Sequence, residues 1–168
     1  AKRANIGATP LTGASPKIPD RRTITYTDGS AILDEDSSQQ ITGAGIYTPL
    51  SHTGHPMEYT AMPNGYGPTN TINRAELAAI YFAIRNGCKH IATDSASSLF
   101  QIKKQILHPM KNAHHLNHEL LQDIATLIED TDHPVYFYKV KSHSGVIGNE
   151  HADYLAHITA KTKSADTS

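Results

Sequence analysis

Apolar residues alternate with polar ones in short segments of this chain and recur every three or four positions in longer segments. The first pattern is typical of strands and the second of amphipathic helices. The short segments predict five strands, at residues 23–27, 41–48, 58–62, 90–93 and 135–140. The longer segments predict four helices, at residues 73–86, 95–107, 116–129 and 149–160. This order predicts an α/β fold with a five-stranded mixed sheet, an antiparallel meander plus parallel strands, flanked by helices.

The domain boundaries follow from changes in composition. Residues 1–20 are rich in Ala, Gly, Thr and Pro and show no apolar periodicity, so we expect a flexible N-terminal tether there. We expect the folded domain to span residues 21–160 and residues 161–168 to form a polar tail. Two loops are expected inside the domain, at residues 31–40 and 141–148. Because the chain begins with Ala rather than Met, we expect it to be a piece of something longer.

The composition is that of an ordinary single domain. The 168 residues, of which 38% are apolar and 18% charged, are enough to bury a proper core. The longest apolar run, residues 77–84, is far short of the ~20 residues that span a membrane, and we expect no membrane partner. The only cysteine, Cys88, excludes an internal disulfide and favours a reducing compartment. We therefore expect an intracellular protein, nuclear or cytoplasmic.

Four carboxylates stand at unusual places in this pattern. Asp28 and Asp94 each follow a Thr at the end of an expected strand, and parallel neighbouring strands would bring the two side by side. Glu76 and Asp153 adjoin the apolar stripes of expected helices. Each has an ordinary interpretation alone, because aspartates form turns and N-caps and carboxylates often border a stripe. Four together indicate a divalent-metal site, since Mg²⁺ prefers carboxylate oxygens and two such ions support phosphoryl chemistry.

Five short strings of residues, in order, resemble type I ribonuclease H. They are Thr-Asp-Gly-Ser at 27–30, Asn-Arg-Ala-Glu-Leu at 73–77, Thr-Asp-Ser at 93–95, Lys-Ser-His-Ser-Gly at 141–145 and Gly-Asn-Glu-His-Ala-Asp at 148–153. The resemblance covers about residues 23–160 and looks most like the ribonuclease H domains of retroelement polyproteins, particularly those without long terminal repeats. It implies endonucleolytic hydrolysis of the RNA strand of RNA/DNA hybrids by a two-metal-ion mechanism. The implied cofactor is two Mg²⁺ ions, for which Mn²⁺ can substitute.

The resemblance also implies roles for particular residues. It maps the catalytic metal ligands to the four carboxylates, Asp28, Glu76, Asp94 and Asp153. It maps His143 to a loop histidine that assists proton transfer or product departure.

The implied substrate-binding residues are five, namely Gly29, Ser30, Thr71, Asn73 and Asn149. Among them, Asn73 matches a residue that senses RNA 2′-hydroxyls, and Thr71 matches a hydroxyl that holds a DNA-strand phosphate. Asn149 begins the last expected helix, near the site.

Other features suggest that this domain grips nucleic acid weakly. Fifteen basic and sixteen acidic residues give a net charge of −1, whereas a stand-alone nucleic-acid binder usually carries a positive field. Thr69 stands where family members often have Arg, and the chain has no Trp where many relatives have a basic, Trp-rich protrusion. We expect an attached or associated reverse transcriptase domain to deliver the RNA/DNA hybrid, and the isolated domain to be a monomer.

Three other functions remain open at this stage. A degenerate domain of the same fold could support a polymerase without catalysis, although the intact acids and His143 argue against it. A DNA-directed, transposase-like nuclease would often have Glu as its last acid and would not be expected to carry these strings as a set. A non-enzymatic nucleic-acid-binding module is disfavoured by the near-neutral charge.

Overall fold

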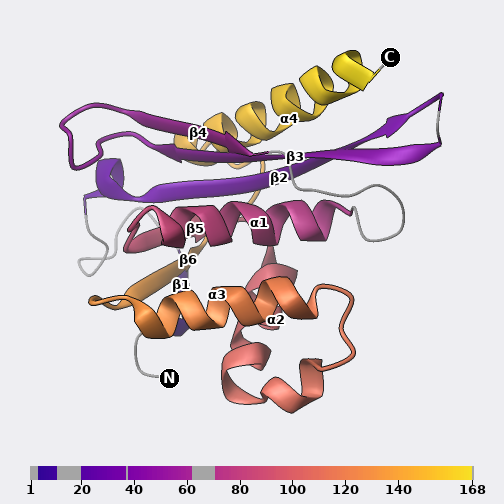
Figure 1. Cartoon of the computed structure of the whole chain (residues 1–168). Coiled ribbons are helices and arrows are strands. Elements are labelled where there is room, and N and C mark those ends of the chain that lie inside the picture. The colour runs from indigo at the N-terminus through magenta and orange to yellow at the C-terminus, as the bar shows by residue number, and fades with distance from the viewer. Residues whose placement is uncertain (1–3, 11–19, 37, 62–70, 168) are drawn as a thin grey trace.

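A mixed sheet forms the centre of the computed structural model, which describes residues 4–10, 20–36, 38–61 and 71–167 (Figure 1). Its strands are β1 Ala4–Pro10, β2 Thr25–Asp34, β3 Gln39–Thr48, β4 Met57–Ala61, β5 His90–Thr93 and β6 Val135–Lys139. Their order across the sheet is β1-β6-β5-β2-β3-β4. The pairs β2–β3 and β3–β4 are antiparallel, whereas β2–β5, β5–β6 and β6–β1 are parallel. The predicted meander extended by parallel strands is confirmed.

Helices cover both faces of this sheet. The helices are α1 Ile72–Arg85, α2 Ala96–Leu107, α3 His118–Asp130 and α4 Ile147–Thr167, with short 3₁₀ turns at Arg21–Thr23 and Pro109–Asn112. Helix α4 packs on one face of β2 and β3, while α1 packs on the other face and is backed by α3 (Figure 1). None of the helices that the structure describes is long and apolar enough to cross a membrane.

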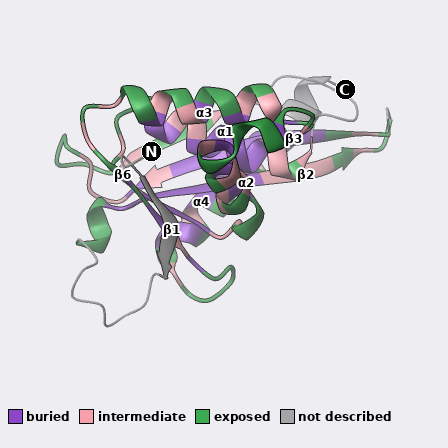
Figure 2. Cartoon of the chain, turned by 90° about the horizontal axis from the view of Figure 1, so that it is seen from below, coloured by how far each residue is buried: buried purple, intermediate pink, exposed green. Residues whose placement is uncertain are grey.

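The apolar core is divided by the sheet into two clusters. The larger one fills the space between the sheet, α1 and α3, and includes Leu77, Ile124 and Phe137. The smaller one lies toward α4 and includes Tyr26 and Ala152. Buried residues accordingly follow the strands and the inward faces of the helices, while the outward helix faces are exposed (Figure 2).

Local signals in the sequence explain where the helices begin and end. Thr71 and Ser95 cap α1 and α2, since their side-chain oxygens accept hydrogen bonds from the backbone N–H groups of Arg74 and Ser98. Gly87 follows the end of α1 with a φ of +84°, and the N–H of Gly87 and of Cys88 donate back to the last turn. This is the arrangement expected of a C-terminal glycine.

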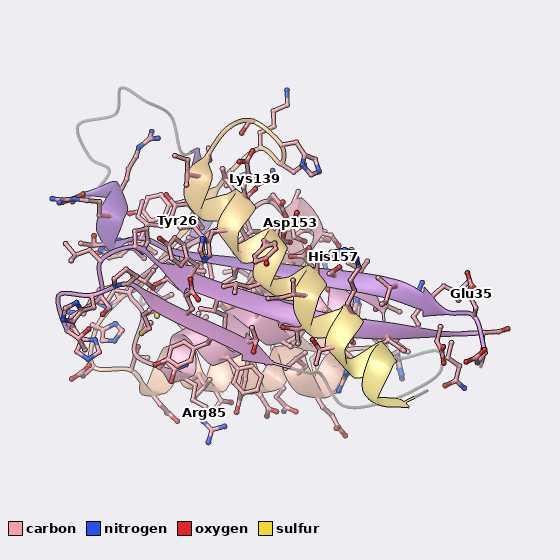
Figure 3. All side chains as sticks on the ribbon, turned by 90° about the horizontal axis from the view of Figure 1, so that it is seen from above. Tyr26, Glu35, Arg85, Lys139, Asp153 and His157 are labelled. Atoms are coloured by element: carbon pink, nitrogen blue, oxygen red, sulfur yellow. The ribbon has the colours of Figure 1, made fainter. Side chains whose placement is uncertain are left out.

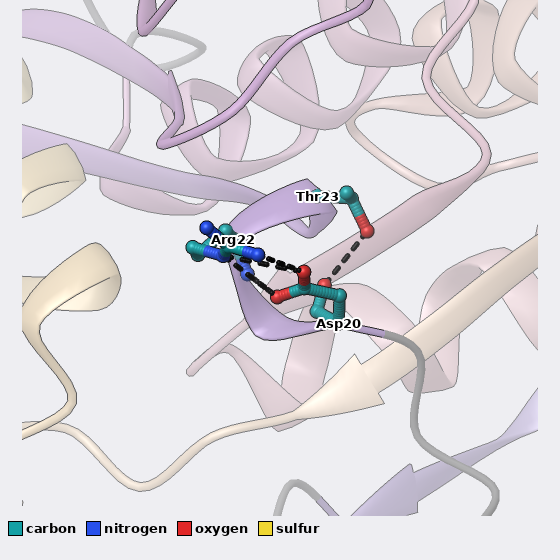
Figure 4. A network of polar contacts seen from close by, with 3 residues as sticks. All are labelled: Asp20, Arg22 and Thr23. Atoms are coloured by element: carbon teal, nitrogen blue, oxygen red, sulfur yellow. Dashed lines mark hydrogen bonds and ion pairs between the residues drawn. The ribbon is translucent and has the colours of Figure 1, made fainter. Parts of the chain in front are cut away.

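The first strand of the central meander is anchored by a small polar network. The carboxylate of Asp20 accepts hydrogen bonds from the backbone N–H of Arg22 at 3.0 Å and from its guanidinium at 2.7 Å. The hydroxyl of Thr23 donates to the backbone carbonyl of Asp20 at 2.7 Å (Figure 4). These contacts close the 3₁₀ turn from which the chain enters β2. Because Asp20 and Arg22 are exposed, their ion pair adds little to stability.

Three sequence-based boundaries need correction. Residues 1–20 are predicted as a tether, but Ala4–Pro10 forms β1, a strand parallel to β6; residues 1–3 and 11–19 lie outside the described part. A strand at the edge of a sheet can satisfy its backbone hydrogen bonds whether or not apolar and polar side chains alternate along it. The sequence pattern therefore does not predict β1. The polar tail is instead helical up to Thr167, because no Gly or Pro interrupts α4 after Ala160.

The loop expected at residues 31–40 is also shorter than predicted. Strand β2 continues to Asp34, which pairs with Gln39 of β3, so only a short turn joins the two strands. This hairpin extends well beyond the helices, and Figure 3 labels Glu35 at its tip. The polar composition that suggested a loop reflects exposure of the hairpin end rather than a lack of pairing.

Glycines in the sheet let α1 and α4 pack so closely that the helix backbone contacts the strand backbone. A Cβ atom at Gly29 would lie 2.5 Å from the backbone N of Glu76 in α1. A Cβ atom at Gly45 would overlap the backbone carbonyl of Ala152 and lie 2.7 Å from the backbone N of Ala156, both in α4. Neither approach can be relieved by turning a side chain, so both positions require glycine.

We expect Gly45→Ala to lower the free energy of unfolding by about 2–3 kcal/mol, because α4 must move away from β3 to admit a methyl group. Urea denaturation measures this difference. Gly54→Ala is the comparison: Gly54 has a φ of +82° but open space around it, so only backbone strain of about 1 kcal/mol is expected. Equal losses in the two variants would contradict the close-packing explanation.

Candidate active site

Two aspartates meet where the parallel pairing of β2 and β5 ends. The last residues paired between these strands are Thr27 and Thr93. The next residues along each chain are Asp28 and Asp94, so they leave the ladder side by side, as predicted. Strand β2 itself continues, because its other edge remains paired with β3. Beside Asp28, the β5 edge of β2 is therefore open to side chains from the helices.

Helix α1 brings a third carboxylate to the same place. Glu76 lies in the second turn of α1, directly above Gly29, and only 8% of its surface is exposed. One oxygen of each carboxylate, from Asp28, Glu76 and Asp94, lies within 4.8 Å of the others. Two adjacent groups hold the aspartates: the N–H of Gly29 donates to Asp28 Oδ1 at 2.9 Å, and Asn149 Nδ2 donates to Asp94 Oδ2 at 3.4 Å.

The fourth predicted carboxylate, Asp153, occupies the rim of this site. It is exposed on α4 and is not part of the three-carboxylate group found among the described residues. It nevertheless lines the same cleft, and after burial and the charge of Asp94 its interaction with Asp28 is a further cause that raises the pKa of the Asp28 carboxyl. Figure 3 labels Asp153 on the first half of α4, where the helix crosses the central strands.

Burial and mutual repulsion make it unfavourable for the three inner carboxylates to be ionised together. Burial, with the negative charge of Asp94, raises the pKa of Asp28 from 3.8 to about 7. Burial, with the charge of Asp28, raises the pKa of Glu76 from 4.5 to about 10. Without a cation, this crowding favours retaining a proton among the carboxyl groups of Asp28 and Glu76 at neutral pH.

The residues present fit a divalent cation. Glu76 Oε2 is buried and has no hydrogen-bond partner among the described residues. A buried acceptor without a partner is unfavourable unless a proton donor or cation satisfies it. All three converging groups offer hard carboxylate oxygens, the ligand type that Mg²⁺ and Mn²⁺ prefer. The cluster Asp28, Glu76 and Asp94 could therefore hold such an ion.

These carboxylates form the floor of a cleft of about 520 Å³. Most of the predicted site residues line it, namely Asp28, Gly29, Asn73, Glu76, Asp94, His143 and Asp153. His143 lies on the loop between β6 and α4, is exposed and adopts a φ of +54°. Its neighbour Gly145 also has a positive φ, of +85°. The loop thus presents the imidazole to the cleft from outside the sheet.

Three predicted substrate-binding residues are not part of the cleft lining. Thr71 caps α1 through its side-chain oxygen, 3.2 Å from the backbone N of Arg74. Asn149 is 2% exposed and donates a hydrogen bond to Asp94. Ser30 lies two residues beyond Asp28 on β2 and is half-buried. Their proposed contacts with nucleic acid stay predictions.

The sequence analysis assigned no site role to four lining residues, Ile72, Ser95, Ser97 and Ser142. Ser95 belongs to the Thr-Asp-Ser string but was given no role of its own there, and in the structure it caps α2. Ser97 carried no signal, because a serine in the first turn of a helix is common. Its place in the cleft depends on where α2 starts relative to Asp94, which the structure alone shows.

The arrangement of sheet, helices and carboxylates is that of a ribonuclease H fold. Residues 20–161 match the RNase H family model, and the chain belongs to this family of ribonuclease H hydrolases. The resemblance inferred from the five strings is thus confirmed. No curated protein sequence matches the chain significantly.

Solved structures share this fold at low sequence identity. The solution structure of the PFV RNase H domain has 22% identity and a TM-score of 0.63, covering 83% of this chain and 94% of that one. RNase H1 from the halophilic archaeon Halobacterium salinarum NRC-1 has 18% identity and a TM-score of 0.56, covering 82% and 96%. Native prototype foamy virus protease-reverse transcriptase has 19% identity and a TM-score of 0.61; the match covers 89% of this chain but 22% of that one.

The raised pKa values predict that the metal-free domain loses stability as pH rises. Between pH 4 and 7 the folded state keeps a proton that Asp28 in the unfolded chain, with its pKa of 3.8, has lost. The free energy of unfolding therefore falls through this window, and the raised pKa of Glu76 extends the loss toward pH 10.

Asp94→Asn removes one of the charges responsible for both shifts. We expect it to raise the free energy of unfolding at pH 8 by on the order of 1 kcal/mol and to flatten the pH dependence. Urea denaturation in EDTA at pH 5 and pH 8 measures both effects. Asp123→Asn, at an exposed position on α3, is the matched control. A variant at Asp94 that is no more stable than this control at pH 8 would contradict the repulsion argument.

Proposed function

We propose that this domain hydrolyses the RNA strand of RNA/DNA hybrids by a two-metal-ion mechanism, within a retroelement polyprotein that contains a reverse transcriptase. The observation that carries the proposal is the cluster of buried Asp28 and Glu76 with half-buried Asp94, in a domain of the RNase H family; Glu76 Oε2 has no partner within the described part of the chain. The exposed Asp153 at the rim supplies the fourth carboxylate of the implied ligand set.

Each residue of the cleft has a defined task in this proposal. Bound Mg²⁺ would activate a water and stabilise the departing 3′-oxygen during in-line displacement at phosphorus. The four carboxylates would hold the cations, and Asn149 orients Asp94 by donating to its Oδ2. A bound cation would favour the ionised forms of Glu76 and Asp28, because its positive charge would offset their mutual repulsion. His143 exchanges a proton with the reacting or departing group at the open side of the cleft.

The charge of the chain supports delivery of the substrate by another domain. A net charge of −1 offers little general attraction for phosphates, so the domain would need help to hold a hybrid. One neighbour in fold is the foamy viral protease-reverse transcriptase in complex with dsDNA. We propose a similar attachment or association with a reverse transcriptase for this domain. The alternative is a catalytically weak domain that positions nucleic acid beside a polymerase. The feature that supports it is the weak attraction for nucleic acid expected from the net charge.

We expect the purified chain with Mg²⁺ to cleave an end-labelled RNA strand that is paired with DNA and to leave the same strand intact when it is paired with RNA. Asp94→Asn should abolish cleavage, because it removes a ligand of the proposed metal site. Gel analysis of the labelled products measures both. Asp123→Asn should cleave like the parent. If the parent cleaves neither duplex with Mg²⁺ or Mn²⁺, the isolated domain is not a competent nuclease, and the alternative is favoured.

We expect His143→Ala to lower kcat on the hybrid by about 100-fold, since proton transfer by a positioned side chain contributes about that much or more. One limb of the pH–rate profile should disappear with the imidazole. His114→Ala, at an exposed position between α2 and α3, is the matched control and should leave kcat unchanged. A His143→Ala profile with the same shape as that of the parent would exclude His143 from proton transfer.

A further inference from the structure

A chain of hydrogen bonds joins two residues of the cleft wall through a third residue behind it. Gln101 Oε1 accepts a hydrogen bond from Asn73 Nδ2 at 3.0 Å. Gln101 Nε2 donates to Ser97 Oγ at 2.9 Å. Asn73 and Ser97 line the cleft, whereas Gln101 is not part of its lining. Among the described residues, the side-chain hydrogen bonds of Gln101 thus connect it to the site through these two neighbours.

Helix geometry brings the three residues together. Ser97 and Gln101 are four residues apart on α2, so their side chains lie on the same face of that helix. Asn73 is the second residue of α1, and its bond to Gln101 links the beginnings of α1 and α2 beside the carboxylates. The backbone of Gln101 is held as well, because Asn112 Nδ2 donates to its carbonyl oxygen at 3.3 Å.

The two bonds made by Gln101 determine which groups remain for a ligand. Asn73 must turn its NH₂ group to Gln101, and its Oδ1 is then buried without a hydrogen-bond partner among the described residues. Ser97 accepts from Gln101, so its hydroxyl hydrogen stays free to donate into the cleft. This wall of the cleft thus holds one unpaired acceptor and one free donor.

We propose that Gln101 is a positioning residue for substrate binding, which fixes the amide of Asn73 and the hydroxyl of Ser97 toward the RNA strand. This proposal rests on the proposed function, in which a hybrid occupies the cleft. The 2′-hydroxyl of RNA both donates and accepts hydrogen bonds, so it matches the acceptor of Asn73 and the donor of Ser97. A DNA strand lacks this group and would leave Oδ1 of Asn73 unpaired.

Gln101→Leu removes both bonds while keeping a side chain of similar size. We expect KM for the hybrid to rise by roughly 3- to 10-fold, the range for a lost hydrogen bond, with kcat within about twofold of the parent. Gln122→Leu, the same substitution at an exposed position on α3, should change neither value. Thermal unfolding of both variants is measured alongside, since a purely structural role would lower the melting temperature and leave KM in place.

A double-mutant cycle tests whether Gln101 acts through Asn73. Asn73→Ala, Gln101→Leu and the double variant are compared, and we expect the double variant to bind no more than about twofold more weakly than Asn73→Ala alone. Fully additive effects would overturn the proposal, because Gln101 would then act independently. A Gln101→Leu variant that matches Gln122→Leu in KM would overturn it too.

A binding measurement separates this proposal from the proposed function. Hybrid affinity is measured by fluorescence anisotropy in the Asp94→Asn background, with a fluorescent RNA/DNA hybrid and with a DNA/DNA duplex of the same sequence. We expect Gln101→Leu to weaken hybrid binding and to leave duplex DNA binding unchanged. This result supports the positioning role even if the parent fails to cleave. Equal weakening on both duplexes, or no weakening, overturns it while leaving cleavage by the parent as separate evidence on function.

Discussion

The backbone contact between α1 and Gly29 is the constraint on which the site depends. A Cβ atom at that position would lie 2.5 Å from the backbone N of Glu76, so only glycine lets α1 descend far enough to bring Glu76 beside Asp28. On β3, Gly45 is the register partner of Asp28, and it allows a similarly close approach of the α4 backbone to the sheet. The two glycines thus fix Asp28 between the helices that carry Glu76 and Asp153. The carboxylate cluster is therefore a consequence of how tightly the layers pack.

The same packing makes the metal-free site electrostatically unfavourable. Glu76 is almost fully buried near two aspartates, and the raised pKa values of Glu76 and Asp28 reflect this burial and crowding. The apolar contacts around Leu77 and Ile80 on the same helix must hold Glu76 in place against this repulsion. Stability and function therefore oppose each other within a single turn of α1, as is common where a site is preorganised for a cation.

The sequence predicted the meander, the four helices and the approach of Asp28 to Asp94, because each leaves a local signal: alternation, helical spacing or a repeated Thr-Asp at a strand end. It overlooked β1, whose pairing with β6 depends on the backbone and on an unpatterned segment. It overlooked the part that Ser97 and Gln101 play for the same kind of reason. The contact of Gln101 with Asn73 joins positions 28 residues apart and depends on the relative placement of α1 and α2. Contacts of this kind follow from tertiary packing rather than from local sequence.

The inner and outer parts of the site differ in how firmly the fold holds them. Asp28, Glu76 and Asp94 come from paired strand ends and a buried helix face, whereas Asp153 and His143 are exposed and belong to α4 and the loop before it. Gly148, in the first turn of α4, packs against the ring of Tyr26, and Val146 of the preceding loop packs against the same apolar cluster. An enzyme that must release a charged product needs such a division, because a cleft closed on all sides by buried ligands would retain it.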